Sequence, residues 1–314
     1  MWKISADPYV DGNILFSDYC AIATTSDGTD VSYVVGLPRN EGYKEGIGSV
    51  AKFRTIGTFE NYNGTHLLIG DYFNHCIRWL NRKTNQTSVF AGRCQVMGTK
   101  DASLLNATFY RPRALAINGN FIYVADFKTH SIRMIDLYTE YVYTLFSGGE
   151  LVYPKGLALD GSRNNLLVTV NHGILSYSLK GSDPNGTAKT NMTEGFNDGT
   201  LEQSRWRYPM SITAIMDHVY IVTDNMNQRV RIVDDAKNSV TSICMGKRGR
   251  VYANATSCKL FSPTSACLFG STLYIGTKQS IVKIDLDVTA AAPTTPQSAT
   301  TGMMALFQTT FRLP

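Results

Sequence analysis

The sequence predicts an all-β protein, a six-bladed β-propeller whose blades are four-stranded antiparallel sheets. The first observation is a recurring pattern in which an apolar run ends in Asp, a five-residue turn follows, and a β-branched residue and Arg open a second run. The polar residues of its three clear copies are Asp71 and Arg78, Asp126 and Arg133, and Asp224 and Arg231. The second is that the apolar runs are short, rich in Val, Ile, Tyr and Phe, and separated by turn dipeptides, as strands are. No stretch keeps the apolar spacing of a helix for the roughly ten residues that a helix needs.

Six units follow one another along the chain, each of roughly 40–50 residues. The second, third and fifth units carry the Asp and Arg pattern, and each closes with a β-rich run that ends in Gly. The first, fourth and sixth units rest on spacing, and they start at Ile14, Leu166 and Leu273. Because a four-stranded unit has to bury a sheet face on its neighbour, six such units are expected to close into a ring.

The repeat resembles that of the NHL-repeat family, whose Asn-His dipeptide stands here at Asn74-His75. The resemblance covers about residues 13–287 and implies a single propeller over residues 1–287, of a kind that serves as a recognition domain. Residues 288–314 form a Thr/Ala/Pro-rich tail, which is typical of an extracellular stalk or a disordered segment. No apolar run reaches the roughly 18 residues that a membrane span needs, and no signal peptide follows Met1.

Propeller geometry predicts where a binding site lies. The innermost strand of each blade runs along the central channel, so the linker that enters it and the turn between the second and third strands share one face, called the top. Loops on one side of a rigid scaffold commonly carry function. The basic and aromatic linker residues expected at this face are Arg54, Tyr110, Arg111, Arg113, Lys155, Arg205, Arg207 and Tyr208.

These residues make the channel mouth more positive than the average surface, which favours an anionic partner. The repeated arginines follow the top turns and are expected to add to this charge. In the alternative interpretation, the aromatic residues pack between blades and the arginines satisfy neighbouring carbonyls. The repeated aspartates are predicted to be structural, because Asp at the end of a strand accepts hydrogen bonds from turn amides.

The chain contains six cysteines and six Asn-x-Thr sequons, which are evidence on its cellular compartment. A hairpin register symmetric about residue 85 sets Cys76 opposite Cys94, close enough for a disulfide. Cys244 and Cys258 flank one linker, while Cys20 and Cys267 lie in the first and last units, which a closed ring makes neighbours. The alternative is six buried thiols. The candidate glycosylation sites are Asn63, Asn85, Asn106, Asn185, Asn191 and Asn254.

Catalysis is not favoured, and no cofactor or metal is expected. Related propellers include metal-dependent hydrolases and lyases with a metal at the top of the channel, which requires converging Asp, Glu, Asn or His side chains. The positions that match the histidine ligands of the zinc-dependent lyase are Arg113, Lys155, Met210 and Thr264. No nucleophile elbow, phosphate loop or His-Glu-x-x-His motif occurs.

The sequence therefore predicts a non-catalytic recognition domain, extracellular or on the cell surface, that binds a protein or an anionic glycan on its basic top face. The sequons, cysteines and Thr/Pro tail support this interpretation. One alternative is a cytoplasmic NHL-type propeller that binds single-stranded RNA on a basic, aromatic face. The other is a metal-dependent hydrolase or lyase.

Overall fold

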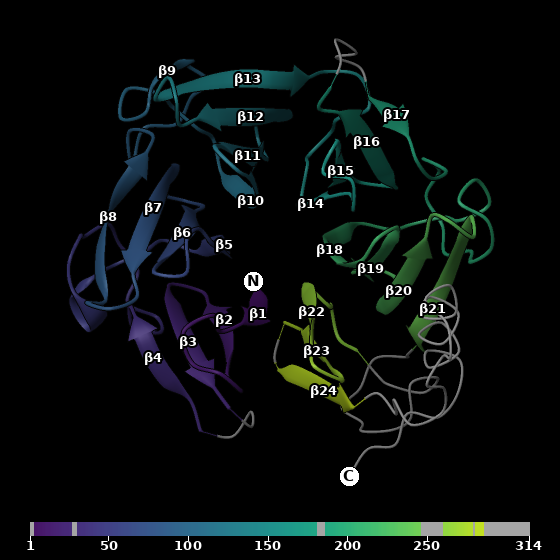
Figure 1. Ribbon diagram of the computed structural model, residues 1–314, viewed down its shortest axis with the longest axis horizontal. Coiled ribbons are helices and arrows are strands. Elements are labelled where there is room, and N and C mark those ends of the chain that lie inside the picture. Colours follow the sequence, from purple (N-terminus) through teal and green to yellow (C-terminus); the bar gives the residue numbers. More distant parts are fainter. Residues whose placement is uncertain (1–2, 27–29, 181–185, 246–259, 279, 286–314) are drawn as a thin grey trace.

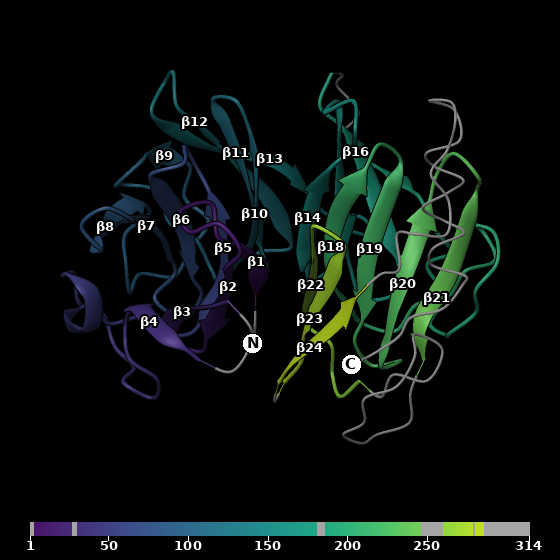
Figure 2. The ribbon, with the colours of Figure 1, turned by 60° about the horizontal axis from the view of Figure 1, so that its bottom comes forward.

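The computed structural model describes residues 3–26, 30–180, 186–245, 260–278 and 280–285 of the 314-residue chain. Within these ranges the chain forms six antiparallel sheets that stand around a central axis, with the first strand of each sheet innermost (Figure 1). Turning the molecule shows the sheets as a ring of upright blades (Figure 2). The predicted all-β, six-bladed propeller is confirmed.

Blades 1 to 3 come from the first half of the chain. Blade 1 consists of β1 (Ile4–Ala6), β2 (Ile14–Asp18), β3 (Ala21–Thr25) and β4 (Ser32–Val35). Blade 2 consists of β5 (Ile56–Asn61), β6 (His66–Asp71), β7 (Cys76–Asn81) and β8 (Gln86–Ala91), and its linker contains the short helix η1 (Gly48–Val50). Blade 3 consists of β10 (Pro112–Asn118), β11 (Phe121–Asp126), β12 (Ser131–Asp136) and β13 (Tyr141–Ser147), with the linker strand β9 (Ala102–Ser103) added at its outer edge.

Blades 4 to 6 complete the ring. Blade 4 consists of β14 (Gly156–Leu159), β15 (Asn165–Thr169), β16 (Ile174–Ser178) and β17 (Thr187–Ala188). Blade 5 consists of β18 (Pro209–Met216), β19 (Val219–Asp224), β20 (Arg229–Asp234) and β21 (Ser239–Met245). Blade 6 has three strands within the described residues, β22 (Ser265–Phe269), β23 (Thr272–Gly276) and β24 (Ile281–Asp285).

The core consists of side chains packed between neighbouring blades. Successive residues of one strand serve opposite interfaces: Leu67 and Ile69 of β6 pack toward blade 1, whereas Leu68 packs toward blade 3. This alternation follows from the strand geometry, in which neighbouring side chains point to opposite faces. Because both faces of a blade are buried, the second strands β6 and β11 are largely continuous apolar runs, which explains these runs in the sequence.

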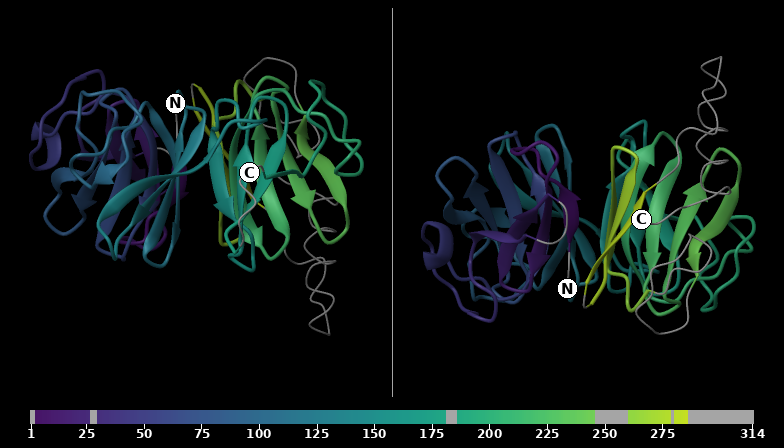
Figure 3. Two further views of the ribbon diagram at one scale, coloured as in Figure 1. Left: turned by 90° about the horizontal axis from the view of Figure 1, so that it is seen from above. Right: turned by 90° about the horizontal axis from the view of Figure 1, so that it is seen from below.

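The ring closes where blade 6 meets blade 1. The innermost strands β1 and β22 lie side by side, and Ile4, Ile14 and Phe16 pack against Cys267 and Tyr274. Views along the rim show blades 1 and 6 as separate sheets (Figure 3). Within the described residues no strand is shared between them, so side-chain packing holds this seam.

The Ile-Arg pair of the repeat marks a β-bulge. The register between the third and fourth strands shifts between Ile77 and Arg78 in blade 2, and the equivalent shifts occur in blades 3 and 5. A bulge interrupts the ladder and re-aims the side chain beside it. The repeated Arg therefore leaves the regular ladder at the same place in each of these blades.

Cys76 and Cys94 form a disulfide with a Cα–Cα distance of 4.9 Å. The predicted pairing is therefore present, although the register that led to it is wrong. Asn81 pairs with Gln86, so the hairpin is centred between residues 83 and 84 instead of at residue 85. Cys94 reaches Cys76 because the chain turns after β8, where Gly92 adopts a left-handed conformation with φ of 90°.

The predicted pairing of Cys20 with Cys267 is wrong, because both cysteines are buried free thiols. Cys20 packs with Phe53 in the interface between blades 1 and 2, whereas Cys267 packs at the seam. The first and last blades are neighbours as expected, yet the two thiols belong to different interfaces. The candidate pair of Cys244 with Cys258 falls outside the described residues at Cys258.

Four of the six sequons lie within the described residues. Asn63 and Asn106 are exposed, while Asn85 and Asn191 are half-buried. Asn185, Asn254 and the predicted tail at 288–314 lie outside the described residues. In the described part of the chain, no helix is long and apolar enough to cross a membrane.

Candidate binding surface

The top face is built by contacts between each linker and the turn that follows the second strand. In blade 2, the backbone N–H of Arg54 donates to Oδ1 of Asp71 at 2.9 Å, and that of Phe73 donates to the carbonyl of Arg54 at 2.9 Å. Equivalent bonds join Tyr110 to Asp126 and Arg207 to Asp224. In these blades the linker and the turn between the second and third strands therefore lie on one face, as predicted.

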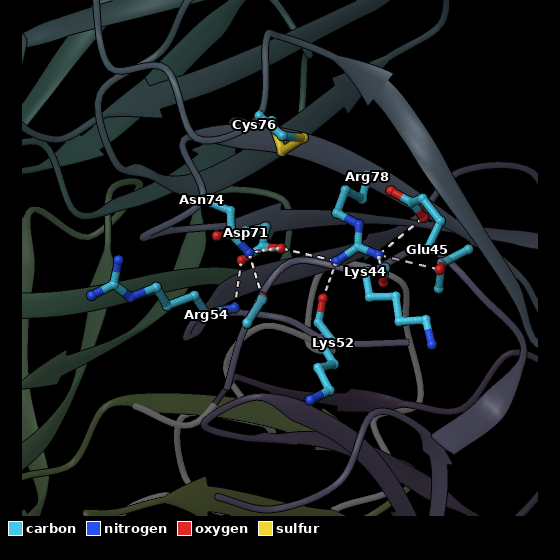
Figure 4. The surroundings of a disulfide bond; sticks show 11 residues. Lys44, Glu45, Lys52, Arg54, Asp71, Asn74, Cys76 and Arg78 are labelled. Carbon is cyan, nitrogen blue, oxygen red and sulfur yellow. Dashed lines mark hydrogen bonds and ion pairs between the residues drawn. A yellow bond between two sulfur atoms is a disulfide. The ribbon is translucent and has the colours of Figure 1, made fainter. Parts of the chain in front are cut away.

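The repeated Asp and Arg form a buried ion pair that fixes the linker to the blade, which we call the linker clamp. In blade 2, Nη1 of Arg78 lies 3.0 Å from Oδ2 of Asp71, and its Nη2 lies 3.0 Å from the linker residue Glu45 (Figure 4). The same guanidinium donates to the carbonyls of Lys44 and Lys52. One arginine thus holds two points of the linker and the end of β6.

The clamp recurs in blades 3 and 5. Arg133 lies 2.7 Å from Asp101 and 3.6 Å from Asp126, and Arg231 lies 2.9 Å from Asp198 and 3.1 Å from Asp224. Each repeated guanidinium also stacks on the linker aromatic residue of its own blade, at ring-centroid distances of 4.1 Å for Phe53, 5.3 Å for Phe109 and 3.9 Å for Trp206.

Two details of the repeat differ from expectation. The repeated arginines are fully buried and paired, so they do not contribute charge to the surface. The aspartates are structural, as predicted, but their side chains mainly accept from linker amides and arginines. Burial raises the pKa of Asp71 to about 6 and that of Asp126 to about 7, against the opposing effect of the paired arginine.

Beside the clamps, the top of blades 2 to 4 carries a continuous series of rings and cations. The rings of Tyr72 and Phe73 lie 4.9 Å apart, those of Tyr72 and Phe127 6.0 Å, and those of Phe127 and Tyr153 5.0 Å. We call this series, together with the cations stacked on it, the cation–aromatic arc. It comprises Arg54, Tyr72, Phe73, Tyr110, Arg111, Phe127, Lys128 and Tyr153.

Three cations of the arc lie over its rings. The guanidinium of Arg111 is 4.8 Å from the Phe73 centroid, that of Arg54 is 5.8 Å from the same ring, and Nζ of Lys128 is 5.1 Å from the Tyr153 centroid. Within the described residues none of the three forms an ion pair with a carboxylate. Nε of Arg111 is buried without a hydrogen-bond partner. Stacking on rings orients these cations while leaving their charge uncompensated.

A groove continues the arc toward blade 4. Its volume is about 340 Å³, and it is lined by Phe127, Lys128, Tyr153, Asn171, His172 and Tyr208. Its walls are chiefly aromatic, and the side chains of Lys128, Asn171 and His172 supply polar groups. A wall of this kind suits a flat or ring-shaped group of a ligand.

The predicted site residues separate into three groups. Arg54, Tyr110 and Arg111 belong to the arc, and Tyr208 lines the groove. Arg113 and Lys155 are buried and line a cavity in the channel below. Arg205 and Arg207 lie apart from the arc contacts, and Arg207 is paired with Glu194 at 2.7 Å.

Sequence reasoning missed most rings of the arc. Tyr72, Phe73, Phe127 and Lys128 directly follow the repeated Asp of blades 2 and 3, in the top turn. The signal was therefore present as an aromatic residue immediately after Asp71 and Asp126. Such a residue in a strand-connecting turn has no repeat-wide spacing that distinguishes it from a core aromatic residue.

The side chains at the channel top are not those of a metal site. Arg113, Lys155, Met210 and Thr264 do converge on one cavity, as their matching positions suggested. Two cations, a thioether and a hydroxyl are a poor donor set for a divalent metal ion, which prefers carboxylate, imidazole or thiolate ligands. No group of three or more His, Cys, Asp or Glu side chains gathers as a metal site in the part of the chain that the structure describes.

No family model matches this chain. In sequence it is 30% identical to NHL repeat-containing protein 2 of Homo sapiens over 152 residues, which are 45% of this chain and 21% of that protein. It is also 30% identical to the Bos taurus protein of the same name over 137 residues, which are 40% of this chain and 19% of that protein. The chain thus spans about a fifth of the length of these curated relatives.

Solved structures share the fold. An auxiliary nutrient binding protein from Bacteroides ovatus superposes with a TM-score of 0.67 at 13% identity, covering 90% of this chain and 69% of that one. A chain of a nidogen/laminin complex superposes with a TM-score of 0.61 at 15% identity, covering 87% and 89%. At this identity the likeness concerns the fold alone. The predicted resemblance to NHL-repeat propellers is confirmed by the sequence relatives together with the six-bladed architecture.

Proposed function

We propose that this NHL-like propeller is a non-catalytic recognition module that binds an anionic protein or glycan on its cation–aromatic arc. The observation that carries the proposal is the set of three stacked cations without carboxylate partners, Arg54, Arg111 and Lys128. Cations that are oriented but not neutralised attract negative charge and steer a partner toward the face that bears them. The neighbouring groove adds aromatic surface for the uncharged part of the ligand.

We also propose that the protein works outside the cell. The Cys76–Cys94 disulfide supports an oxidising compartment, because such bonds persist in secreted proteins and are rare in the cytosol. The exposed sequon at Asn63 supports the same location. It lies in the turn between β5 and β6, on the opposite face from the arc, so a glycan there leaves the arc uncovered.

The binding proposal is tested with a triple variant, Arg54→Gln, Arg111→Gln and Lys128→Gln. Each removed charge weakens attraction to a polyanion, and we expect at least about a tenfold loss of affinity for a sulfated glycosaminoglycan or an acidic peptide. The matched control removes three lysines at the other ends of the blades, namely Lys83, Lys180 and Lys237. Equal affinity of the two triple variants and the unmodified chain would refute the arc as the binding surface.

Single-stranded RNA is the second candidate ligand, and the contiguous rings favour it. Phe73 and Tyr153 at the two ends of the series are half-buried and can each stack on a base, whereas Tyr72 and Phe127 are buried and support them from below. An oligoribonucleotide is therefore measured beside the glycan at the same salt concentration. Tighter binding of RNA that is lost in Phe73→Ala and Tyr153→Ala variants would replace the glycan proposal.

Peptide mapping of material made by its native cells tests the location. Extracellular protein is expected to show oxidised Cys76 and Cys94 and a glycan at Asn63 or Asn106. Reduced cysteines together with bare sequons would exclude an extracellular role.

A further inference from the structure

Two cations lie below the arc, inside the channel. Arg113 is the second residue of β10, and Lys155 directly precedes β14, so both enter the channel from the linkers of adjacent blades. Arg113 is 5% exposed to solvent, and Lys155 is 2% exposed. Charged side chains so deeply buried are normally paired with an opposite charge.

Neither cation has such a partner within the described residues. Nη2 of Arg113 donates to the thioether sulfur of Met210 at 2.9 Å, which is a weak acceptor. Nζ of Lys155 donates to Oδ1 of Asn171 at 2.8 Å and to the carbonyl of Tyr153 at 3.1 Å, both of which are neutral. The hydroxyls of Tyr72 and Tyr208 are the other polar groups facing Arg113. The site thus holds positive charge without compensation.

A cavity of about 40 Å³ separates the inner strands at this level. Its wall includes both cations and Met210, together with the polar residues Thr58, Ser211 and Thr264. Lys3 and Glu60 also line it, but they form an ion pair with each other at 2.5 Å. That pair is neutral overall, so the excess charge of the wall comes from Arg113, and from Lys155 when its amine is protonated. A water molecule needs roughly 10–15 Å³, so the cavity has room for one small group.

The cavity is continuous with the lower channel. A larger cavity of about 470 Å³ shares the wall residues Lys3, Glu60, Leu115, Leu157 and Ile212. It extends to Asp160 and Asp217, which stand at or next to the turns at the other end of β14 and β18. Above, the rings of Phe127 and Tyr208 lie over Arg113 and Lys155 at 4.9 and 4.1 Å. The larger cavity provides a route to the two side chains from the bottom face, opposite the arc.

We propose that Arg113 and Lys155 form a site for a single small anionic group of carboxylate size, which enters the channel from the bottom face. The planar guanidinium of Arg113 suits two oxygens of one carboxylate, and the ammonium of Lys155 supplies a further donor. An anion between them replaces the poor thioether acceptor and cancels charge that burial otherwise makes costly. This site is distinct from the arc, and it does not depend on the proposed function.

Binding is coupled to a proton on Lys155. Burial and, secondarily, the charge of Arg113 lower the pKa of Lys155 to about 6, so its amine is largely neutral at pH 7.5 in the empty site. The other titratable groups around it are the Tyr208 ring directly above and the neutral Lys3–Glu60 pair below. An entering anion favours the ammonium form, so binding takes up a proton and weakens as the pH rises above 6.

The experiment uses the full chain with acetate and hexanoate at constant ionic strength. Thermal unfolding is followed against carboxylate concentration, because a ligand that binds the native state raises the unfolding temperature. Calorimetry in two buffers of different ionisation enthalpy then measures proton uptake at pH 7.5. We expect saturable stabilisation, close to one proton taken up, and binding at least about tenfold weaker in Lys155→Met and Arg113→Met.

Controls separate this site from the arc. Arg111→Gln is expected to bind carboxylate like the unmodified chain, although it weakens the polyanion binding proposed for the arc. Stronger binding of hexanoate than of acetate assigns the site to a carboxylate carried by a larger ligand, and equal binding assigns it to a free small anion. Lys155→Met keeps the size of a buried side chain and removes its charge, so it tests the site even if Arg113→Met does not fold. No stabilisation, or equal stabilisation of Lys155→Met and the unmodified chain, would overturn the proposal.

Discussion

Lys155 and Asp71 show how burial changes the chemistry of single residues in this propeller. Both are buried at the top of a blade, yet Asp71 has Arg78 as an ionic partner, whereas Lys155 has neutral partners in the described structure. For both groups, desolvation is the main cause of the altered pKa. The contribution of Asp71 to stability consequently depends on its partner Arg78, and that of Lys155 depends on pH.

Replacing Lys155 with Met is expected to change the pH dependence of stability. The native pKa of Lys155 lies near 6 and its usual value is 10.5, so the unfolded state binds more protons between these values. In the absence of anions, the free energy of unfolding of the unmodified chain therefore rises from pH 6.5 to pH 9.5 relative to Lys155→Met, by about 1–4 kcal/mol. Urea unfolding at the two pH values measures this difference, with the exposed Lys83→Met as the control. An equal change in the free energy of unfolding between the two pH values for the unmodified chain and Lys155→Met would contradict the prediction.

Replacing Asp71 with Asn is expected to destabilise blade 2. The change leaves the buried Arg78 with only Glu45 as an ionic partner, and removing one member of a buried pair costs about 3–5 kcal/mol. Asp136→Asn is the matched control, because Asp136 ends a strand without contacting an arginine and its side chain accepts from the Tyr138 amide. Denaturant unfolding of both variants checks the prediction, which fails if their losses are equal.

The repeat spacing of the sequence predicts the blades and their common face, but not the bulges or the turns that end a strand. Four-stranded blades and the common face of linkers and second turns follow from repeat spacing, because equivalent residues take equivalent places in a repeated unit. The bulge at Ile77/Arg78 and the turn after β8 do not follow, since a one-residue shift leaves the apolar pattern intact. For the same reason the Cys76–Cys94 pair was predicted from an incorrect register.

The candidate site was predictable only in part, for a related reason. Spacing places Arg54 and Arg113 on linkers at the same end of their blades, but burial decides between surface and channel. Whether an arginine is free or paired depends on carboxylates some 30 residues away, as Asp101 and Arg133 show. Contacts between blades therefore remain invisible to a single sequence, and the arc, which crosses from blade 2 to blade 4, is such a contact.

Reduction of the disulfide is expected to loosen the outer hairpin of blade 2. Cys76 and Cys94 are separated by 18 residues, and closing a loop of about that length stabilises a protein by about 3 kcal/mol. A reductant should therefore lower the unfolding temperature of the unmodified chain. The double variant Cys76→Ala/Cys94→Ala should show the lower temperature already and no response to reductant. If a reductant lowers the unfolding temperature of the double variant by the same amount, the Cys76–Cys94 disulfide is not the cause.

The whole molecule depends on six interfaces between blades, one of which is the seam between blades 6 and 1. Phe16 fills the seam, and Phe59 fills the interface between blades 1 and 2. Each of these two interfaces contains one free buried thiol, Cys267 at the seam and Cys20 between blades 1 and 2. Burial raises the pKa of Cys267 to about 12, which keeps this thiol unreactive while the seam is closed.

Loosening one interface is expected to expose its own thiol. Phe16→Ala creates a cavity at the seam and should raise the rate at which a maleimide labels Cys267, while Phe59→Ala should raise the labelling of Cys20. Each substitution is expected to cost about 3–5 kcal/mol of stability. Peptide mapping by mass spectrometry distinguishes the two cysteines. Equal labelling of both thiols in both variants would show that the ring opens as a whole.

The seam also has a consequence for the order of folding. Each of the other interfaces joins blades adjacent in the chain, whereas the seam joins Ile4 to Cys267 across almost the entire described length. Bringing together residues so far apart carries the largest loop-closure entropy in the molecule, and contacts of that kind form slowly. During synthesis, the apolar side of blade 1 therefore remains without its partner until β22 has been made. Among the six described blades, we therefore expect blade 6 to dock onto blade 1 last.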